Sequence, residues 1–257
     1  MTALPELVRY LDSELRAAEV PDYDGALNGL QLGNSGQVTR IAAAVDFSLN
    51  TVAGAIREGA TLLIVHHGMF WAGARPIVDV AYERLRQAIA ADLAVYSSHI
   101  PLDIHPELGN NTLLARELGL EPDSGFGRYK DVTVGVSGSA SLPTREILER
   151  TRAFSRRHAS GVVSTPFDDS RRTERWAVVT GAGASTATLA EARERGVDTL
   201  IVGEGAHHTG VEALERGPVV IYAGHYATET LGVQALARKA GDRFQLPITF
   251  VDVPTGL

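Results

Sequence analysis

The sequence predicts an α/β protein made of two related, closely packed αβα-type halves with mixed sheets. Three observations support this prediction. Short apolar runs without polar alternation, such as "LLIV" (62–65), are typical of strands that are covered on both faces. Amphipathic helical patterns alternate with these runs. A segment of the first half also recurs in the second half, with no low-complexity linker between them.

The recurrence is a gapless match between residues 48–68 and residues 185–205, at an offset of 137. Nine of the 21 aligned positions are identical, whereas average composition predicts about one or two by chance. Each copy opens on a serine that can cap a helix, and a glycine follows where that helix should end. An apolar strand comes next. The serines and glycines are Ser48, Ser185, Gly59 and Gly196.

A second pair of similar segments follows, "VYSSHIPLD" (95–103) and "IYAGHYATE" (221–229). Each contains a short apolar strand, a histidine after it and a carboxylate four residues further on. We therefore divide the chain into a first repeat half, 1–125, and a second, 126–257, which includes a divergent middle segment. That segment predicts a strand near "DVTVGVSGS" and a helix that opens near Pro143.

The composition excludes several classes of protein. The chain has 24 basic and 31 acidic residues, a formal net charge of −7, which argues against broad binding to nucleic-acid phosphates. It has no cysteine, so disulfides, thiolate metal sites and cysteine nucleophiles are excluded. The N-terminal segment lacks the pattern of a signal peptide, and no apolar run approaches membrane-spanning length. We expect a cytoplasmic protein without a membrane partner.

Six of the eight histidines fall where predicted strands end. Ligand sites of open α/β sheets collect at the carboxyl ends of strands, so two halves that face each other predict a metal site between them. Imidazole with carboxylate suits zinc, iron, manganese, cobalt or nickel, without choosing among them. More than four such ligands exceed the needs of one tetrahedral ion, which favours two. The six are His66, His67, His99, His207, His208 and His225.

Structural roles remain open as alternatives for the same residues. His66 and His67 could be a strand-end pair that hydrogen-bonds only to the backbone. His225 with Glu229 could be a helix-start histidine and an acid favoured by the helix dipole. Asp103 could cap a turn. The sequence alone leaves both readings of these residues standing.

Three segments, "LIVHHG", "SSHIPLD" and "GHYATE", resemble those of the dinuclear-metal-centre proteins known as type 2 GTP cyclohydrolase I homologues. "ALNGLQLG" and "VGEGAHH" are also similar to segments of that family. The resemblance runs from about Asp24 to the C-terminus apart from the middle, and this chain is similar to the short form without an inserted domain. One departure is "IPLD", which replaces a more usual Thr-Asn-Leu-Asp.

The resemblance implies a ligand set for two divalent transition-metal ions, with Glu229 as the bridge between them. The implied ligands are His66, His67, Asp103, His225 and Glu229. His99, Glu204 and His208 are implied as catalytic groups that move protons. The resemblance also implies a homohexamer, a trimer of dimers with the sites facing inward.

Two functions follow as hypotheses. The first is a metal-dependent hydrolase that attacks a small substrate through a metal-bridging water. The family label implies a purine nucleotide opened at its imidazole ring, although phosphoester or amide hydrolysis would use the same metal chemistry. The second is a non-catalytic, metal-loaded oligomer that binds protein partners, senses metal or stores it. A catalytic site keeps an open coordination position, whereas a structural site is saturated by protein ligands.

Overall fold

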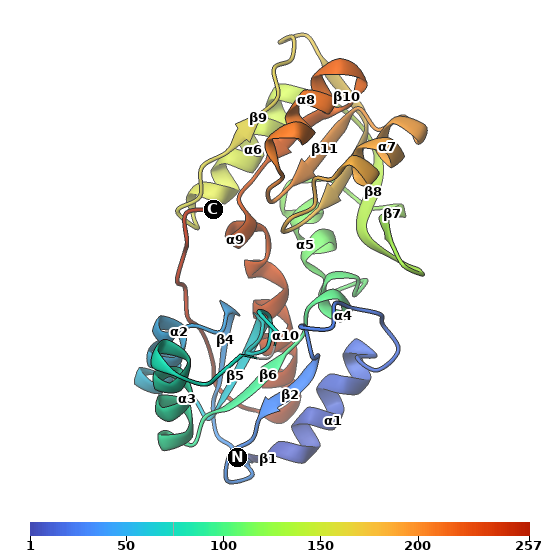
Figure 1. Cartoon of the computed structure of the whole chain (residues 1–257). Helices are drawn as coiled ribbons and strands as arrows, with labels where there is room; N and C mark the ends of the chain where they lie inside the picture. The colour runs from blue at the N-terminus through green and yellow to red at the C-terminus, as the bar shows by residue number, and fades with distance from the viewer. Residues whose placement is uncertain (74) are drawn as a thin grey trace. The chain divides into compact units, whose positions relative to one another are not determined.

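The structure, a computed structural model, describes residues 1–73 and 75–257. Its contacts divide the chain into two compact units. The first unit comprises Met1–Leu102 with Gly232–Val253, and the second comprises Asp103–Leu231 with Pro254–Leu257. Each unit has its own sheet with helices on both faces (Figure 1). The predicted α/β class is therefore confirmed.

These compact units are a different division of the chain from the predicted repeat halves. The units are defined by contacts, while the halves, 1–125 and 126–257, are defined by sequence similarity. The long C-terminal helix illustrates the difference, because the ring of its Phe244 packs edge-on against Tyr10 of the first unit at 5.4 Å. The division into two repeat halves that meet after residue 125 stays a prediction.

A five-stranded sheet forms the centre of the first unit, in the order β13-β4-β5-β6-β2. The first four of these strands are parallel, and β2 is antiparallel to β6. A two-stranded ribbon, β1 with β3, lies apart from this sheet. The strands are β1 (Thr2–Ala3), β2 (Gly29–Leu32), β3 (Gln37–Val38), β4 (Ile41–Asp46), β5 (Leu62–His67), β6 (Ala94–Ser97) and β13 (Ile248–Phe250).

Helices cover both faces of this sheet, as the unbroken apolar strands predict. Alternate residues of β4, β5 and β6 pack with α2 and α3 on one face. On the other face the hydroxyl of Tyr96 donates to Asp12 of α1 at 2.9 Å. The helices are α1 (Leu4–Leu15), α2 (Leu49–Arg57), α3 (Asp79–Ala90), α4 (Ile100–Asp103) and α10 (Thr230–Phe244), of which the last two cross from one unit to the other.

A six-stranded mixed sheet forms the second unit, in the order β7-β8-β10-β11-β12-β9. The strands β10, β11 and β12 are parallel, and the outer strands are antiparallel to their neighbours. The predicted middle strand and the helix that opens after Pro143 are both present, as β8 and α6. The strands are β7 (Ser124–Tyr129), β8 (Val132–Pro143), β9 (Val163–Ser164), β10 (Arg172–Val179), β11 (Thr199–Val202) and β12 (Val219–Tyr222).

Two apolar cores lie on the two faces of this second sheet. One joins α5 and α6 to the fully buried Trp176, and the other joins α7 and α8 to Phe126. Alternate residues of β10 and β11 point to opposite cores because strand side chains alternate between faces. The helices are α5 (Asn110–Glu117), α6 (Thr144–Arg156), α7 (Thr186–Glu194), α8 (His207–Arg216) and α9 (His225–Thr228).

The local structures predicted for the two similar segments are present in both units. Ser48 accepts a hydrogen bond from the amide of Thr51 at 3.2 Å, and the Thr51 hydroxyl accepts from the Ser48 amide at 2.8 Å. In the second unit Ser185 accepts from the amide of Thr188 at 3.1 Å. The helices then end at left-handed glycines, with φ of 70° at Gly59 and 65° at Gly196.

We predict that Ser48→Ala lowers the free energy of unfolding by about 1 kcal/mol, because the first turn of α2 loses a side-chain acceptor for its amides. Chemical denaturation measures the change. Asn50→Ala is the matched control, since Asn50 is exposed in the same turn. Equal stability of the two variants would contradict the assigned cap.

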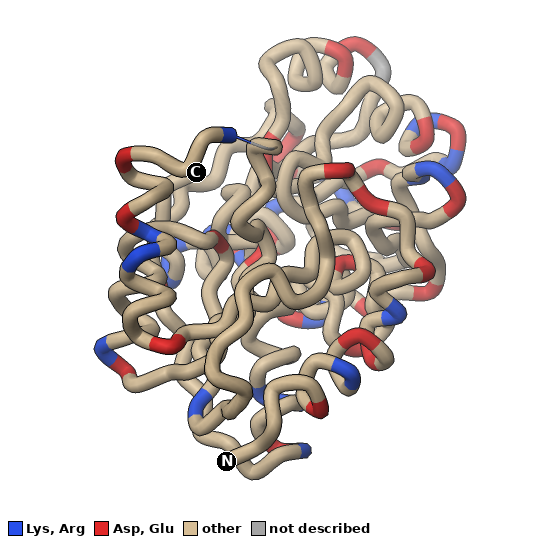
Figure 2. Tube along the Cα trace, turned by 60° about the horizontal axis from the view of Figure 1, so that its bottom comes forward, with Lys and Arg blue, Asp and Glu red and all other residues tan. Residues whose placement is uncertain are grey.

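Acidic and basic residues are interspersed along the chain trace (Figure 2). Several basic side chains pair with acids about one helical turn away, such as Arg86 with Glu83 at 2.7 Å and Arg195 with Glu191 at 2.9 Å. An exposed pair such as Arg86 with Glu83 adds little stability. Within the described part of the chain, no helix has both the length and the apolar content needed to cross a membrane.

Candidate metal centre

Three histidines gather at the carboxyl end of the sheet in the first unit. His66 and His67 are the last residues of β5, and His99 follows the end of the neighbouring parallel strand β6. Their ring centroids lie 4.8 to 5.7 Å apart. One ligand nitrogen from each lies within 4.8 Å of the others. We call His66, His67 and His99 the three-histidine cluster.

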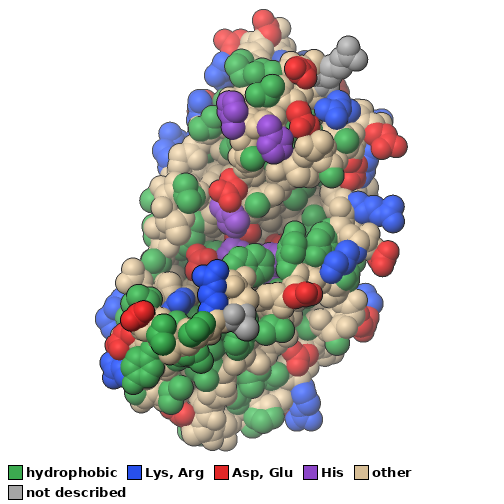
Figure 3. All heavy atoms as spheres, viewed as in Figure 1, with side chains coloured by type: hydrophobic (Ala, Val, Ile, Leu, Met, Phe, Trp, Pro, Cys, Tyr) green, Lys and Arg blue, Asp and Glu red, His purple; other side chains and the backbone are tan. Residues whose placement is uncertain are grey.

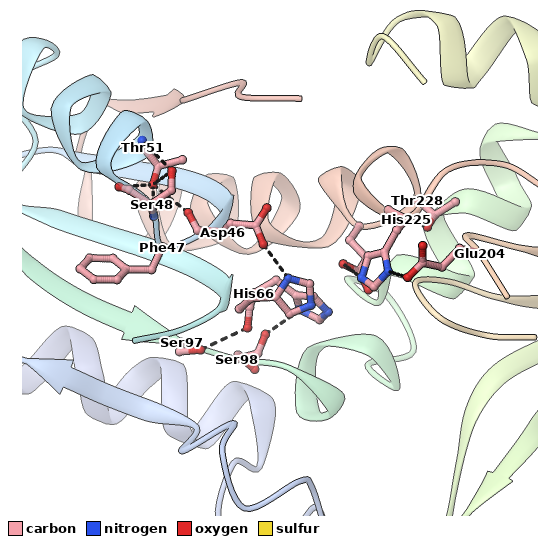
Figure 4. Close-up of polar contacts among 12 residues, drawn as sticks. Asp46, Phe47, Ser48, Thr51, His66, Ser97, Ser98, Glu204, His225 and Thr228 are labelled. Atoms are coloured by element: carbon pink, nitrogen blue, oxygen red, sulfur yellow. Dashed lines mark hydrogen bonds and ion pairs between the residues drawn. The ribbon is translucent and has the colours of Figure 1, made fainter. Parts of the chain in front are cut away.

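Each ring of the three-histidine cluster is held through its Nδ1 atom by an oxygen acceptor. His66 Nδ1 lies 2.9 Å from the carbonyl oxygen of Ser98 (Figure 4). His67 Nδ1 and His99 Nδ1 each lie 2.8 Å from a carboxylate, that of Asp46 and that of Asp22 respectively. When Nδ1 carries the proton and donates it, Nε2 keeps its lone pair, which is the form of imidazole that binds a metal.

Asp22 connects His99 to the loop that precedes β2. Its side chain is only 7% exposed and accepts from His99 Nδ1 at 2.8 Å, Asn28 Nδ2 at 2.9 Å and the Ile100 amide at 2.9 Å. Burial opposes ionisation, but the hydrogen bonds and the charge of His99 outweigh it, so the pKa of Asp22 lies below its ordinary value. Asp22 therefore stays ionised and fixes the orientation of His99.

Glycine follows His67 for reasons of space. Gly68 is not among the described glycines with positive φ, so the position does not require the conformational freedom of glycine. A Cβ at this position would instead collide with the side-chain amide of Gln31 and lie 2.6 Å from Ser97 Oγ. The two histidine side chains converge at the strand end itself, with their rings tilted by 51° to each other.

In the second unit, His225 aligns with His99 of the first unit and lies at the start of α9, after β12. Its Nδ1 lies 2.8 Å from Glu204 Oε1, as Figure 4 shows, and its Nε2 lies 3.1 Å from Glu229 Oε2. Glu229 is 3% exposed. Gly181, with φ of 59°, lies against this carboxylate so closely that a Cβ there would overlap Glu229 Oε1. A side chain at position 181 would therefore clash with the Glu229 carboxylate.

Asp103 is buried in the second unit, away from solvent. Its Oδ1 accepts from Asn110 Nδ2 at 2.9 Å, at the first residue of α5. Helix α5 packs against α9, which begins with His225. Asn111, the next residue of α5, donates to the Val134 carbonyl at 2.6 Å and accepts from the Thr180 amide at 2.8 Å. These contacts fix α5, and with it Asp103, to β8 and β10.

The predicted proton-transfer residues fall in different surroundings. His99 belongs to the three-histidine cluster, and Glu204 holds His225. His207 and His208 are the first residues of α8 and are exposed, and Figure 3 shows histidines at the surface in this region. Among the described residues, the groups with metal-ligand spacing include His99 but not His208. The roles assigned to these residues stay predictions.

A pocket of about 450 Å³ lies beside Glu204 within the second unit. Its wall is mostly apolar, with Tyr222 and Leu214, and also includes His207. The Tyr222 hydroxyl is 2.8 Å from Thr209 Oγ1, which holds the phenol against α8. This space is large enough for part of a small organic molecule.

Sequence reasoning missed the two carboxylates that orient histidines in the first unit. Asp46 had a usable signal, because it ends β4 and the parallel register pairs it directly with His67. Asp22 had none, since it lies in an irregular loop 77 residues before His99. Only the folded chain brings Asp22 and His99 together.

We predict that His225 is protonated in the metal-free protein at neutral pH. Burial lowers its pKa, but hydrogen bonds and charges of Glu229 and Glu204 outweigh burial and raise the pKa from 6.5 to about 9. A raised pKa stabilises the folded state fully below pH 6.5, and this stabilisation is lost as the pH rises towards 9. Metal ligation by His225 must also displace the proton.

The measurement is the denaturation midpoint of chelator-treated protein between pH 6 and pH 9.5, for wild type and His225→Gln. The variant lacks the titrating group, so the advantage of the wild type should shrink as the pH rises. A difference that is constant across this range would contradict the assigned charge.

The fold and these side chains define the class of the protein: a two-unit α/β protein whose buried histidine and glutamate side chains can hold metal. The profile of the family described as Duf34/NIF3 (NGG1p interacting factor 3) matches residues 2–255. The chain belongs to this family.

Relatives with full-length similarity agree with this assignment. A Deinococcus radiodurans protein named "GTP cyclohydrolase 1 type 2 homolog" is 42% identical over 98% of this chain and 94% of its own. The solved structure of protein ybgI, described as of unknown function, has 33% identity and a TM-score of 0.88 over the whole of both chains. TTHA1606 from Thermus thermophilus has 36% identity and a TM-score of 0.84, also over both chains. The resemblance that the sequence motifs indicated is confirmed.

Proposed function

We propose that the protein is a metal-dependent hydrolase of a small substrate. The observation that supports this most is an arrangement that four histidines share, in which an oxygen acceptor lies within hydrogen-bond distance of Nδ1. Such outer acceptors orient metal-bound histidines in proteins. The four are His66, His67, His99 and His225.

The proposed centre holds two divalent transition-metal ions through the ligands that the family resemblance implies. The donors are imidazole and carboxylate, which fit zinc, iron, manganese, cobalt or nickel. When bound, such ions lower the pKa of a coordinated water and polarise the bond under attack. The proposed ligands are His66, His67, Asp103, His225 and Glu229.

The chain's own residues orient ligands and move protons in this proposal. Asp46 and Glu204 hold the rings of His67 and His225. His99 with the buried Asp22 forms a histidine–carboxylate pair, which can accept a proton at Nε2 and return it. Glu204 and His208 remain proposed proton carriers on the strength of the resemblance.

The proposed substrate is a small molecule, with a purine nucleotide opened at its imidazole ring as the first candidate. The names of the relatives support this choice, since they call those proteins GTP cyclohydrolase 1 type 2 homologs. Small phosphoesters and cyclic amides are further candidates, because the same donor set serves their hydrolysis.

We also propose that the protein assembles as a hexamer, a trimer of dimers. Exposed apolar side chains on and before α3 support self-association, since Val78, Val80 and Ile89 are each between 57% and 63% exposed. Large apolar side chains that are exposed in a contiguous patch commonly mark an interface. Light scattering after size-exclusion chromatography gives the number of subunits directly, and a monomer would remove the proposal.

The test of function combines elemental analysis with a hydrolysis screen. Gently purified protein is analysed for metal per subunit and then offered GTP, simple phosphoesters and cyclic amides with and without that metal. Close to two ions per chain with metal-dependent turnover supports the hydrolase. Two ions without turnover of any candidate favours the metal-loaded scaffold or storage protein. No metal, even after reconstitution, removes both functions.

A further inference from the structure

Two exposed aromatic side chains stand beside the three-histidine cluster in the first unit. Trp71 is 42% exposed and Tyr23 is 53% exposed. The Trp71 ring centroid lies 4.5 Å from His99 and 4.9 Å from His67. Tyr23 lies 5.8 Å from His99 and meets Trp71 edge-on at 6.1 Å. The two rings therefore contact the three-histidine cluster on one side and solvent on the other.

The loops that carry these rings are fixed to each other. Gln31 Nε2 donates to the carbonyls of Ala26 and Leu27 at 2.9 Å, while its Oε1 accepts from the Met69 amide at 2.6 Å. This one side chain thus joins the Tyr23 loop to the Trp71 loop. Gly25 adds a close approach, because a Cβ there would lie 2.9 Å from the Trp71 carbonyl oxygen.

Tyr23 is also tied to the cluster through Asp22. The carboxylate of Asp22 accepts from the Tyr23 amide at 2.7 Å and from His99 Nδ1 at 2.8 Å. The position of the Tyr23 backbone and the orientation of His99 are therefore set by one buried group. Rings that are held in place yet exposed lose little entropy when a ligand covers them.

The chemistry of such a pair favours a flat, conjugated partner. Aromatic side chains bind heteroaromatic rings by stacking on their π faces. A quaternary ammonium ion also binds aromatic rings, but divalent ions held by the neighbouring histidines would repel it. A neutral or anionic ring suffers no such repulsion.

We propose that Tyr23 and Trp71, whose ring planes are 79° apart, form a platform next to the three-histidine cluster on which the planar heteroaromatic ring of a ligand stacks against one ring and meets the other edge-on. The proposal rests on the proposed function in that this ring belongs to the substrate. It adds a recognition element that is independent of metal.

The two tryptophans of the chain make the test direct. Trp71 is half exposed and Trp176 is fully buried, so a ligand that stacks on Trp71 quenches one emitter and leaves the other as an internal reference. The probes are guanosine 5′-monophosphate, ribose 5-phosphate as its ring-free counterpart, and tetramethylammonium. Each is titrated into chelator-treated and metal-loaded protein.

We expect saturable quenching by the guanosine nucleotide in both states of the protein and none by ribose 5-phosphate. Calorimetry should show that Tyr23→Leu and Trp71→Leu each weaken nucleotide binding about tenfold, as loss of a stacking ring does elsewhere. Trp71→Phe should retain most of the affinity. Tyr82→Leu is the matched control, since it removes a ring that is 55% exposed on α3.

Equal binding of both phosphates, unchanged affinity in the two leucine variants, or saturation by tetramethylammonium alone would each overturn the platform. The outcome is separable from that of the hydrolase proposal. Metal-dependent turnover of substrates without a ring, with no quenching, would remove the platform and keep the hydrolase. Ring binding without metal uptake would do the reverse.

Discussion

The double variant His67→Ala, Glu229→Ala should be a folded protein that retains little metal after purification. His67 offers its Nε2 because Asp46 holds the opposite nitrogen at 2.8 Å. Glu229 is 3% exposed and offers a carboxylate next to His225. Removing both takes one donor from each unit, and no remaining side chain at these two positions can ligate.

Metal per subunit is measured by elemental analysis of wild type and variants purified in parallel. Far-UV circular dichroism and the denaturation midpoint establish that each variant is folded. His208→Ala is the matched control, because it removes an exposed imidazole from α8. Full metal content in the double variant would show that the ligand assignment is wrong.

The single variants separate one shared centre from two independent sites. If His67 and Glu229 serve the same pair of ions, each single variant should lose most of the metal, and the losses in the double variant should not add. If they serve separate sites, each single variant should lose its own share and the effects should add. Additive losses would contradict the proposed dinuclear centre.

Asp46→Ala should weaken metal binding about 10- to 100-fold, as removal of an outer acceptor of a metal-bound histidine does in other sites. Asp46 fixes both the tautomer and the direction of the His67 ring through the 2.8 Å contact at Nδ1. Without it, the ring can rotate and either nitrogen can carry the proton. The Nε2 lone pair is then available only part of the time.

Asp46→Asn is the matched variant, because its amide oxygen can still accept from His67 Nδ1 while the negative charge is gone. We expect it to retain more affinity than Asp46→Ala. Competition with a chromophoric chelator gives both constants. Equal affinity of Asp46→Ala and wild type would mean that His67 is not a ligand, whatever the geometry of its Nδ1 contact.

Local patterns in the sequence predicted much of the local structure, such as the ends of helices and strands. The serine caps at Ser48 and Ser185 and the left-handed glycines Gly59 and Gly196 lie where the patterns placed them. These features depend on neighbours within a few residues, so the sequence carries them directly. The same holds for His66 and His67 at the end of β5, since an apolar run and the residues that follow it define a strand end.

Such local patterns did not predict contacts between distant segments. Asp22 lies 77 residues from His99, and nothing in the intervening sequence couples the two. Gly68 shows the same limit, because its requirement for space comes from Gln31, which belongs to another strand. The pairing of Tyr23 with Trp71 likewise depends on two loops that meet only in the folded unit.

The α/β class, the family and the histidine and carboxylate residues of the candidate metal centre follow from local periodicity and from motifs. The contact that each histidine makes through Nδ1 is visible only in the folded chain, as with Asp46 and His67. A hydrogen bond is directional and short-ranged. Its partner is therefore chosen by the register of strands and the closure of loops, which no linear pattern records.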